Sequence, residues 1–217
     1  MTKTLFVDLW SDVVCPFCGL GRAQLDVAIA SFEHGKDVVV RLHAFELDPR
    51  PHEASDLSLE ELVARKYGRS VEQIRAHHRR LEEQARDFGF HWNFDRARPA
   101  NTFDAHRLIA LATTQDRGEQ MNSRLFRAYF EEGRLISDHD VLNELALESG
   151  VVGAPELWNG DDFADVVRRD EATATELGLS GVPAFVVDEK FLISGAQGVE
   201  AIRGVLERAW ARRASSS

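Results

Sequence analysis

The sequence has little cysteine and no long apolar run. Only two of its 217 residues are cysteines. No apolar stretch approaches the roughly 18 residues that a membrane-spanning helix needs. Asp8 and Asp12 interrupt the amino-terminal stretch MTKTLFVDLWSD, where a secretory signal peptide would have a continuous apolar segment. We therefore expect a cytoplasmic protein that makes no contact with membranes.

An excess of positive charge is also missing. The formal net charge is −10, from 26 lysines and arginines against 36 acidic residues. Basic residues alternate with acidic ones, whereas a nucleic-acid-binding protein usually carries a basic patch or stripe. The composition thus argues against nucleic acid as a partner and is otherwise that of an ordinary globular protein.

Both cysteines stand in one short stretch, CPFC at residues 15–18. A disulfide that closes so small a loop removes little entropy from the unfolded chain, so it would stabilise the fold weakly. Zinc usually takes four ligands, and no further cysteine or finger-like histidine pair accompanies these two, so we expect no metal. Two inert core thiols are another alternative. Redox chemistry is the favoured interpretation, because a strand, a loop and a helix surround the motif.

The surroundings of CPFC divide the two thiols into different roles. A strand is predicted at 5–10, and a helix is predicted to begin at Pro16, a residue favoured at the first helical position. Cys15 would then lie at the positive end of the helix dipole, which favours its thiolate. Cys18 follows one turn later, close enough to attack a mixed disulfide on Cys15. We therefore expect Cys15 to be the nucleophile and Cys18 the resolving thiol.

Asp8 interrupts the predicted strand before the motif. A partly buried carboxylate at this position would be able to take the proton of Cys18 during its attack. A strand has two faces, however, and an Asp8 on the solvent-facing side would have no such role. The sequence leaves both positions open, and Asp8 is a candidate catalytic residue.

Strand signals occur only near the two ends of the chain. Between about 56 and 150 the apolar residues follow a helical period, and roughly five helices fit there. The remaining predicted elements are a helix to about 32, a strand at 38–45, a helix at 161–177, strands at 184–187 and 191–193, and a last helix at 199–210.

This distribution predicts an α/β fold assembled from both ends of the chain. The first half of the core would span 1–54 and the second half 153–217, with an all-helical domain inserted at 55–152. The sequence contains no internal repeat and no low-complexity linker.

Five short blocks stand in an order shared with one protein family. They are SDVVCPFC at 11–18, FELDP at 45–49, NTFDAHRL at 101–108, SGVPAFVV at 180–187 and SGAQ at 194–197. On these blocks the chain resembles the DsbA superfamily of thioredoxin-fold oxidoreductases, and specifically its FrnE-type branch. The resemblance implies a thioredoxin fold with a helical insertion and a thiol–disulfide oxidoreductase of protein or small-molecule substrates. It implies no cofactor, with glutathione as a candidate redox partner.

The resemblance also implies a set of substrate-binding residues. It implies that Pro183 follows a cis peptide bond and lies beside Cys15, which leaves the backbone of Val182 to pair with an extended substrate. Within CPFC, Pro16 and Phe17 are expected to contact substrate.

Two further residues are expected where the helical domain faces the active site, namely Asn101 and His106. From the residues alone, Asn101 is equally a helix N-cap and His106 equally a packed residue on a helix face.

The chain departs from its relatives inside the motif. Phe17 stands where many relatives have tryptophan and where strongly oxidising periplasmic enzymes have histidine. Phenylalanine offers no hydrogen-bond donor to a Cys15 thiolate, so we expect a less oxidising potential than that of a periplasmic oxidase.

Two other function classes share this architecture or its surfaces. Kappa-type glutathione transferases and hydroxychromene carboxylate isomerases have the same insertion but generally carry serine where Cys15 stands, so both thiols favour exchange. A binding or holdase module would instead use a groove between the domains and leave Cys15 and Cys18 idle.

Overall fold

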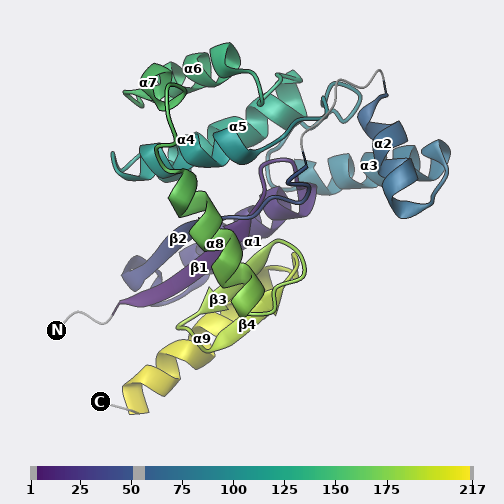
Figure 1. Ribbon diagram of the computed structural model, residues 1–217. Helices are drawn as coiled ribbons and strands as arrows, with labels where there is room; N and C mark the ends of the chain where they lie inside the picture. Colours follow the sequence, from purple (N-terminus) through teal and green to yellow (C-terminus); the bar gives the residue numbers. More distant parts are fainter. Residues whose placement is uncertain (1–3, 51–56, 216–217) are drawn as a thin grey trace. The chain divides into compact units, whose positions relative to one another are not determined.

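The computed structural model describes residues 4–50 and 57–215 (Figure 1). In chain order its elements are β1 (Leu5–Ser11), α1 (Pro16–Ser31), the 3₁₀ turn η1 (Gly35–Asp37), β2 (Val38–Ala44), α2 (Leu59–Tyr67), α3 (Val71–Arg86), α4 (Phe103–Thr113), α5 (Gly118–Arg127), the π turn η2 (Ala128–Glu132), α6 (His139–Glu148), α7 (Ala154–Leu157), α8 (Ala164–Glu176), β3 (Ala184–Val187), β4 (Phe191–Ser194) and α9 (Val199–Ser215). The predicted α/β fold is confirmed, with strands near both ends and helices between them.

The chain divides into two compact units. One consists of Met1–Leu47 with Arg168–Ser217, and the other of Asp48–Val167. The boundary predicted after residue 54 lies outside the described residues. The second boundary was predicted after residue 152, whereas the contacts of α7 with α4 and α6 keep the following segment with the helical unit.

A four-stranded sheet forms the first unit, in the order β2-β1-β3-β4. β1 runs parallel to β2 and antiparallel to β3, and β4 pairs antiparallel with β3. Parallel neighbours cannot be joined by a tight turn, and α1 supplies the crossover between β1 and β2. The pairing of Trp10 with Ala184 places the start of β3 beside the end of β1.

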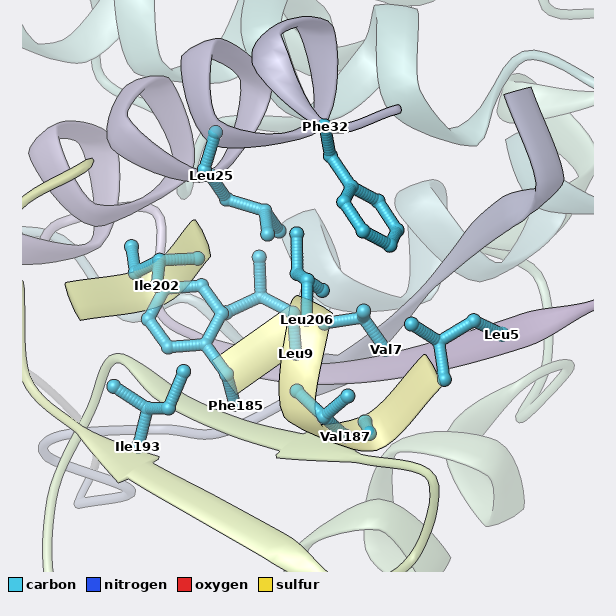
Figure 2. Packing of buried hydrophobic residues seen from close by; sticks show 12 residues of the cluster. Leu5, Val7, Leu9, Leu25, Phe32, Phe185, Val187, Ile193, Ile202 and Leu206 are labelled. Atoms are coloured by element: carbon cyan, nitrogen blue, oxygen red, sulfur yellow. The ribbon is translucent and has the colours of Figure 1, made fainter. Parts of the chain in front are cut away.

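The main core lies on one face of this sheet, under α1 and α9 (Figure 2). Side chains two apart along a strand share a face, so Leu5, Val7 and Leu9 all point into this core. The other buried members are Leu25, Ala28 and Phe32 of the α1 region, Phe185, Val187 and Ile193 of the hairpin, and Ile202, Leu206 and Ala209 of α9. Trp10 points to the other face, where it packs with Ala174 of α8 and Ala184.

In the helical unit, α3 buries the face that its periodicity predicts. Ile74, His78, Leu81 and Ala85 are its buried residues. Burial lowers the pKa of His78 to about 4, although the charge of Glu60 acts in the opposite direction. The His78 ring stacks on Phe94 with centroids 4.1 Å apart. His78 is thus a neutral core residue.

The helix starts of this unit also match the sequence patterns. Ser58 with Glu61 and Ser70 with Gln73 form capping boxes at the beginnings of α2 and α3. Each box satisfies backbone N–H groups that have no partner within the helix.

The β3–β4 hairpin turns through two residues with left-handed backbone. Asp188 and Glu189 have φ values of 55° and 56°, and the Lys190 N–H donates to the Val187 carbonyl at 3.1 Å. This geometry is that of a type I′ turn, in which side chains other than those of glycine, asparagine and aspartate fit poorly. Asp188 is held by hydrogen bonds, whereas Glu189 is exposed.

We predict that Glu189→Gly raises the free energy of unfolding by up to about 1 kcal/mol, because glycine adopts this backbone without steric cost. Urea denaturation measures the change. Glu189→Ala is the matched control, since alanine removes the carboxylate but keeps the steric cost. Equal stability of the glycine and alanine variants would contradict this explanation.

Candidate active site

The sequence between β1 and α1 fixes the position of Cys15. The Cys15 N–H donates to the Asp12 carbonyl at 3.0 Å, which closes a tight turn after β1. Cys15 is the N-cap of α1, and Pro16 occupies the first helical position. The Cys15 carbonyl then accepts from Cys18 N–H at 3.0 Å. The predicted start of the helix is thus confirmed, with Cys15 at the positive end of its dipole.

The two sulfur atoms have different surroundings. The Cys15 thiol lies 3.6 Å from the Val182 carbonyl, to which it donates. The Cys18 sulfur accepts from the Asp12 N–H at 3.5 Å. The exposed fraction is 4% for Cys15 and 0% for Cys18, so neither is open and Cys18 is fully enclosed.

The pKa of the Cys18 thiol is raised well above its usual value. Burial is the main cause, and the hydrogen bond and charge of Cys15 act in the same direction. Hydrogen bonds from Asp12 and Ser11 partly oppose them. Cys18 therefore remains a thiol at neutral pH until something removes its proton.

The loop before β3 completes the site. The Val182–Pro183 bond is cis, as the resemblance implies, and Pro183 is buried. The Phe17 side chain, by contrast, is 41% exposed. The structure brings CPFC and the Val182–Pro183 loop together through the contact between Cys15 and the Val182 carbonyl.

Comparisons with known proteins agree with this geometry. A family model described as a DSBA-like thioredoxin domain matches residues 6–207. The chain belongs to the DSBA-like thioredoxin domain family. This DsbA-like assignment makes the chain a redox enzyme by family, and the FrnE-type branch stays a prediction.

Individual relatives cover most of the chain. A probable DsbA oxidoreductase from Streptomyces coelicolor is 34% identical, with a TM-score of 0.91 over 95% of this chain and 90% of that one. The uncharacterised protein YwbO of Bacillus subtilis is 31% identical over 90% of this chain and 92% of its own. The cytosolic disulfide reductase DsbM of Pseudomonas aeruginosa, at 20% identity and a TM-score of 0.66 over 95% and 98%, shares the fold.

In this DsbA-like chain, Asp8 lies away from the thiols. Its neighbours Val7 and Leu9 point into the core beneath α1, so Asp8 points to the opposite face. There it accepts hydrogen bonds from Arg41 at 2.6 Å and pairs with His43 at 2.8 Å. This placement does not support the predicted role of Asp8 in taking the Cys18 proton.

His43 joins Asp8 to helix α8. Its second ring nitrogen lies 2.7 Å from an Asp170 oxygen, and its ring stacks on Trp10 at 4.3 Å. Burial opposes protonation of His43, but the hydrogen bonds with Asp170 and Asp8 prevail and raise its pKa to about 9. At neutral pH a cationic histidine therefore bridges two carboxylates, which is a structural arrangement.

Asn101 and His106 belong to the helical unit. The Asn101 side chain accepts from the Phe103 N–H at 3.0 Å, so it supports the start of α4 locally, one residue before the N-cap Thr102. His106 is buried within α4. Their predicted contact with substrate stays a prediction.

Three residues at the site had no predicted role: Ser11, Asp12 and Gly21. Ser11 and Asp12 belong to the block that carries CPFC, and both hydrogen-bond to the Cys18 sulfur. Gly21 lies within α1, where a Cβ atom would stand 2.9 Å from Pro183 Cγ and 3.1 Å from Phe185 Cζ. A glycine inside a helix is the signal that would have identified it, because glycine is unfavourable there without a packing reason.

The described part of the chain shows neither a group of side chains placed to bind a metal ion nor a helix that could span a membrane. Among residues 4–50 and 57–215, no group of three or more His, Cys, Asp or Glu side chains is placed to hold a metal ion. None of the helices described is long and apolar enough to cross a bilayer.

We predict that iodoacetamide labels Cys15 at least about tenfold faster than Cys18 in the folded, reduced protein. Each unit by which the Cys18 pKa is raised cuts its thiolate fraction tenfold, and full burial slows access further. Mass mapping after brief labelling measures both rates. The urea-unfolded chain is the control and should label both equally, and faster labelling of Cys18 in the folded protein would reverse the assignment.

We predict that Gly21→Ala lowers the rate of disulfide exchange several-fold with little change in thermal midpoint. Alanine favours the helix by about 1 kcal/mol, but its methyl group must displace Pro183 from the site. Gly204→Ala in α9 is the matched control, because the nearest atom there is the flexible end of Arg208 at 3.6 Å. Full exchange activity in Gly21→Ala would show that the close approach of α1 to Pro183 is dispensable.

Proposed function

We propose that the chain catalyses thiol–disulfide exchange, with Cys15 as nucleophile and Cys18 as resolving thiol. The observation that supports this most is the pair of sulfur atoms at the start of α1, one at the N-cap and the other buried with a raised pKa. Such a pair assigns first attack to Cys15 and holds Cys18 protonated until a mixed disulfide has formed.

The reaction has two exchange steps. The Cys15 thiolate attacks one sulfur of a substrate disulfide, so a mixed disulfide forms and the other substrate sulfur leaves as a thiolate. Cys18 then attacks the Cys15 sulfur, which forms the Cys15–Cys18 disulfide and releases the second substrate thiol. The same steps in reverse transfer the disulfide to a dithiol substrate.

The substrate is a protein or a small molecule with a thiol or disulfide, bound beside the Val182–Pro183 loop. The exposed Phe17 ring next to Cys15 gives this edge an apolar surface, and Pro16, Asn101 and His106 are further proposed contacts. Glutathione is the proposed small redox partner, and DsbM, which has the same fold, has been solved with GSH. The proposed location is the cytoplasm.

The direction of electron flow depends on the reduction potential. Phe17 provides no donor to a Cys15 thiolate, so the reduced form gains less stabilisation than a histidine would provide. We expect a potential more negative than about −120 mV, the value for the periplasmic oxidase DsbA. Equilibration with glutathione buffers measures it.

The second candidate function is that of a glutathione-dependent transferase or isomerase. Its relatives generally carry serine at the position of Cys15, and the presence of both thiols favours exchange. Activity that needs glutathione but survives replacement of both cysteines would favour this candidate. Binding of substrate that survives the same replacement without any turnover would favour the holdase.

We predict that Cys18→Ser accumulates a mixed disulfide with substrate, while Cys15→Ser loses insulin reduction down to the uncatalysed rate. Without the resolving thiol the mixed disulfide can be released only by an outside thiol. Turbidity measures insulin reduction, and mass spectrometry after acid quenching measures the trapped species.

Serine keeps nearly the volume of each cysteine, so thermal midpoints of both variants serve as the control for folding. A Cys15→Ser protein that reduces insulin at the wild-type rate would rule out exchange through this dithiol.

A further inference from the structure

His43 joins three elements of the sheet unit, on the face of the sheet that carries Trp10. It lies in β2, and its two ring nitrogens lie 2.8 Å from an oxygen of Asp8 in β1 and 2.7 Å from an oxygen of Asp170 in α8. The second oxygen of Asp170 accepts the Ala44 N–H at 2.9 Å. One imidazole ring thus ties α8 to both β1 and β2.

This bridge needs a positive charge. A neutral imidazole has one N–H, so it can donate to one carboxylate and must turn a lone pair toward the other. Only the doubly protonated ring donates to Asp8 and Asp170 at once. Burial disfavours that charge, but the hydrogen bonds with Asp170 and Asp8 outweigh it and raise the pKa of His43 to about 9. The bridge is therefore intact at neutral pH and opens at one end as the ring loses its proton.

The other charged groups around the ring do not replace its charge. Arg41, from the same strand as His43, donates to both oxygens of Asp8 at 2.6 Å. Glu189 of the β3–β4 turn acts on the charge of Arg41. Within residues 4–50 and 57–215, His43 is the only cationic side chain that pairs with Asp170. A neutral His43 would leave that carboxylate without a cation.

The same ring supports Trp10. The two rings stack with centroids 4.3 Å apart and planes 15° apart. The face of an indole attracts a cation, so the charged form of His43 favours this stack. The indole N–H donates to the backbone carbonyl of Asp170 at 3.0 Å. His43 and α8 together therefore fix the position of the indole.

Trp10 belongs to the small hydrophobic cluster beside the Val182–Pro183 loop. It is buried with Ala184, its pairing partner in β3, and Val182 packs against the same cluster. The Val182 carbonyl in turn accepts from the Cys15 thiol at 3.6 Å. A movement of Trp10 would thus reach the backbone beside which the substrate is proposed to bind.

We propose that His43 is a positioning residue for protein substrates: held between Asp8 and Asp170, its cation fixes Trp10 and thereby keeps the Val182–Pro183 loop ready to pair with an extended chain. This inference rests on the proposed exchange function. His43 acts through Trp10 rather than by contact with the reacting sulfur atoms. A small disulfide that needs no pairing with the loop should react without its help.

The first test compares a protein disulfide with a small one. The pre-reduced protein is mixed with excess insulin or with Ellman's reagent, and acid quenching with mass mapping follows formation of the Cys15–Cys18 disulfide. The dependence on insulin concentration gives a maximal rate and a half-saturating concentration. Both are measured for wild type and His43→Gln.

His34→Gln is the matched control. The His34 ring also stacks on a tryptophan, Trp210, with centroids 4.2 Å apart. Trp210 packs against the main core under α1 and α9 instead of the cluster beside Val182. The control therefore removes a histidine–tryptophan stack without disturbing the loop, and thermal midpoints of both variants report any loss of stability.

We expect His43→Gln to raise the half-saturating insulin concentration about fivefold at neutral pH and to change the maximal rate less than about twofold. Weakened binding with an intact chemical step produces this separation. The rate with Ellman's reagent should stay at the wild-type value, and His34→Gln should match wild type throughout. A wild-type half-saturating concentration in His43→Gln, or an equal loss of rate with both disulfides, would overturn the proposal.

The second test follows the charge of His43 directly. Both cysteines of the chain are joined in the disulfide form, so no thiol titrates there. NMR follows the His43 ring, the Trp10 indole N–H and the Val182 carbonyl carbon against pH. The proposal expects all three to change with one midpoint, near pH 9, and the Val182 carbon to stay constant over this range in His43→Gln.

A Val182 carbon that stays constant while His43 titrates, or that changes equally in His43→Gln, would overturn the proposal. The curves of wild type decide alone in the case in which His43→Gln does not fold.

The two proposals can fail separately. If wild type forms the Cys15–Cys18 disulfide with neither reagent, the exchange function fails and the role of His43 fails with it. If wild type reacts with Ellman's reagent alone, exchange stands and the role of His43 in binding a protein fails. If wild type reacts with both and His43→Gln matches it, only the role of His43 fails.

Discussion

The packing of β1 against α1 is the constraint on which the site depends. Val7 and Leu9 share a core with Leu25 and Ala28, so the start of α1 must lie where β1 ends. The antiparallel pairing of β3 with β1 brings the loop before Ala184 to the same end. Cys15 and the Val182 carbonyl therefore meet although most of the chain separates them. Because strands and a helix hold these groups, their positions are more firmly set than loops would allow.

The two thiols differ because α1 presents them to different surroundings. Cys15 stands at the N-cap, beside a carbonyl of the β3 loop, while Cys18 lies one turn later and turns toward the end of β1. Two identical side chains three residues apart thus have different surroundings, which supports the separate tasks proposed for them. The difference comes from burial and from the hydrogen bonds of the two sulfur atoms.

The sequence patterns predicted the helices and strands well, but they did not predict the contacts that side chains make across the sheet. The helical period identified the helices between about 56 and 150, and strand signals near the two ends identified β2 and β3, because these patterns are local. The face of the sheet to which Asp8 points could not be predicted in this way. Side chains alternate between the two faces of a strand, and which face is buried depends on where α1 packs. His43, the partner of Asp8, and the more distant Asp170 meet only in the folded sheet. The need for glycine at position 21 likewise depends on the folded structure, because the side chain that leaves no room for a Cβ atom there belongs to the distant Pro183.

His43 in the sheet unit and His78 in the helical unit respond in opposite ways to acid and base. His43 has its pKa raised to about 9, so the stability it contributes to the sheet unit is complete below about pH 6.5 and is lost as the pH rises through 9. His78 has its pKa lowered to about 4, so its contribution to the helical unit is complete above about pH 6.5 and is lost as the pH falls through 4. The contribution of His78 is therefore lost on the acid side and that of His43 on the basic side. Both histidines make their full contribution to stability only near about pH 6.5.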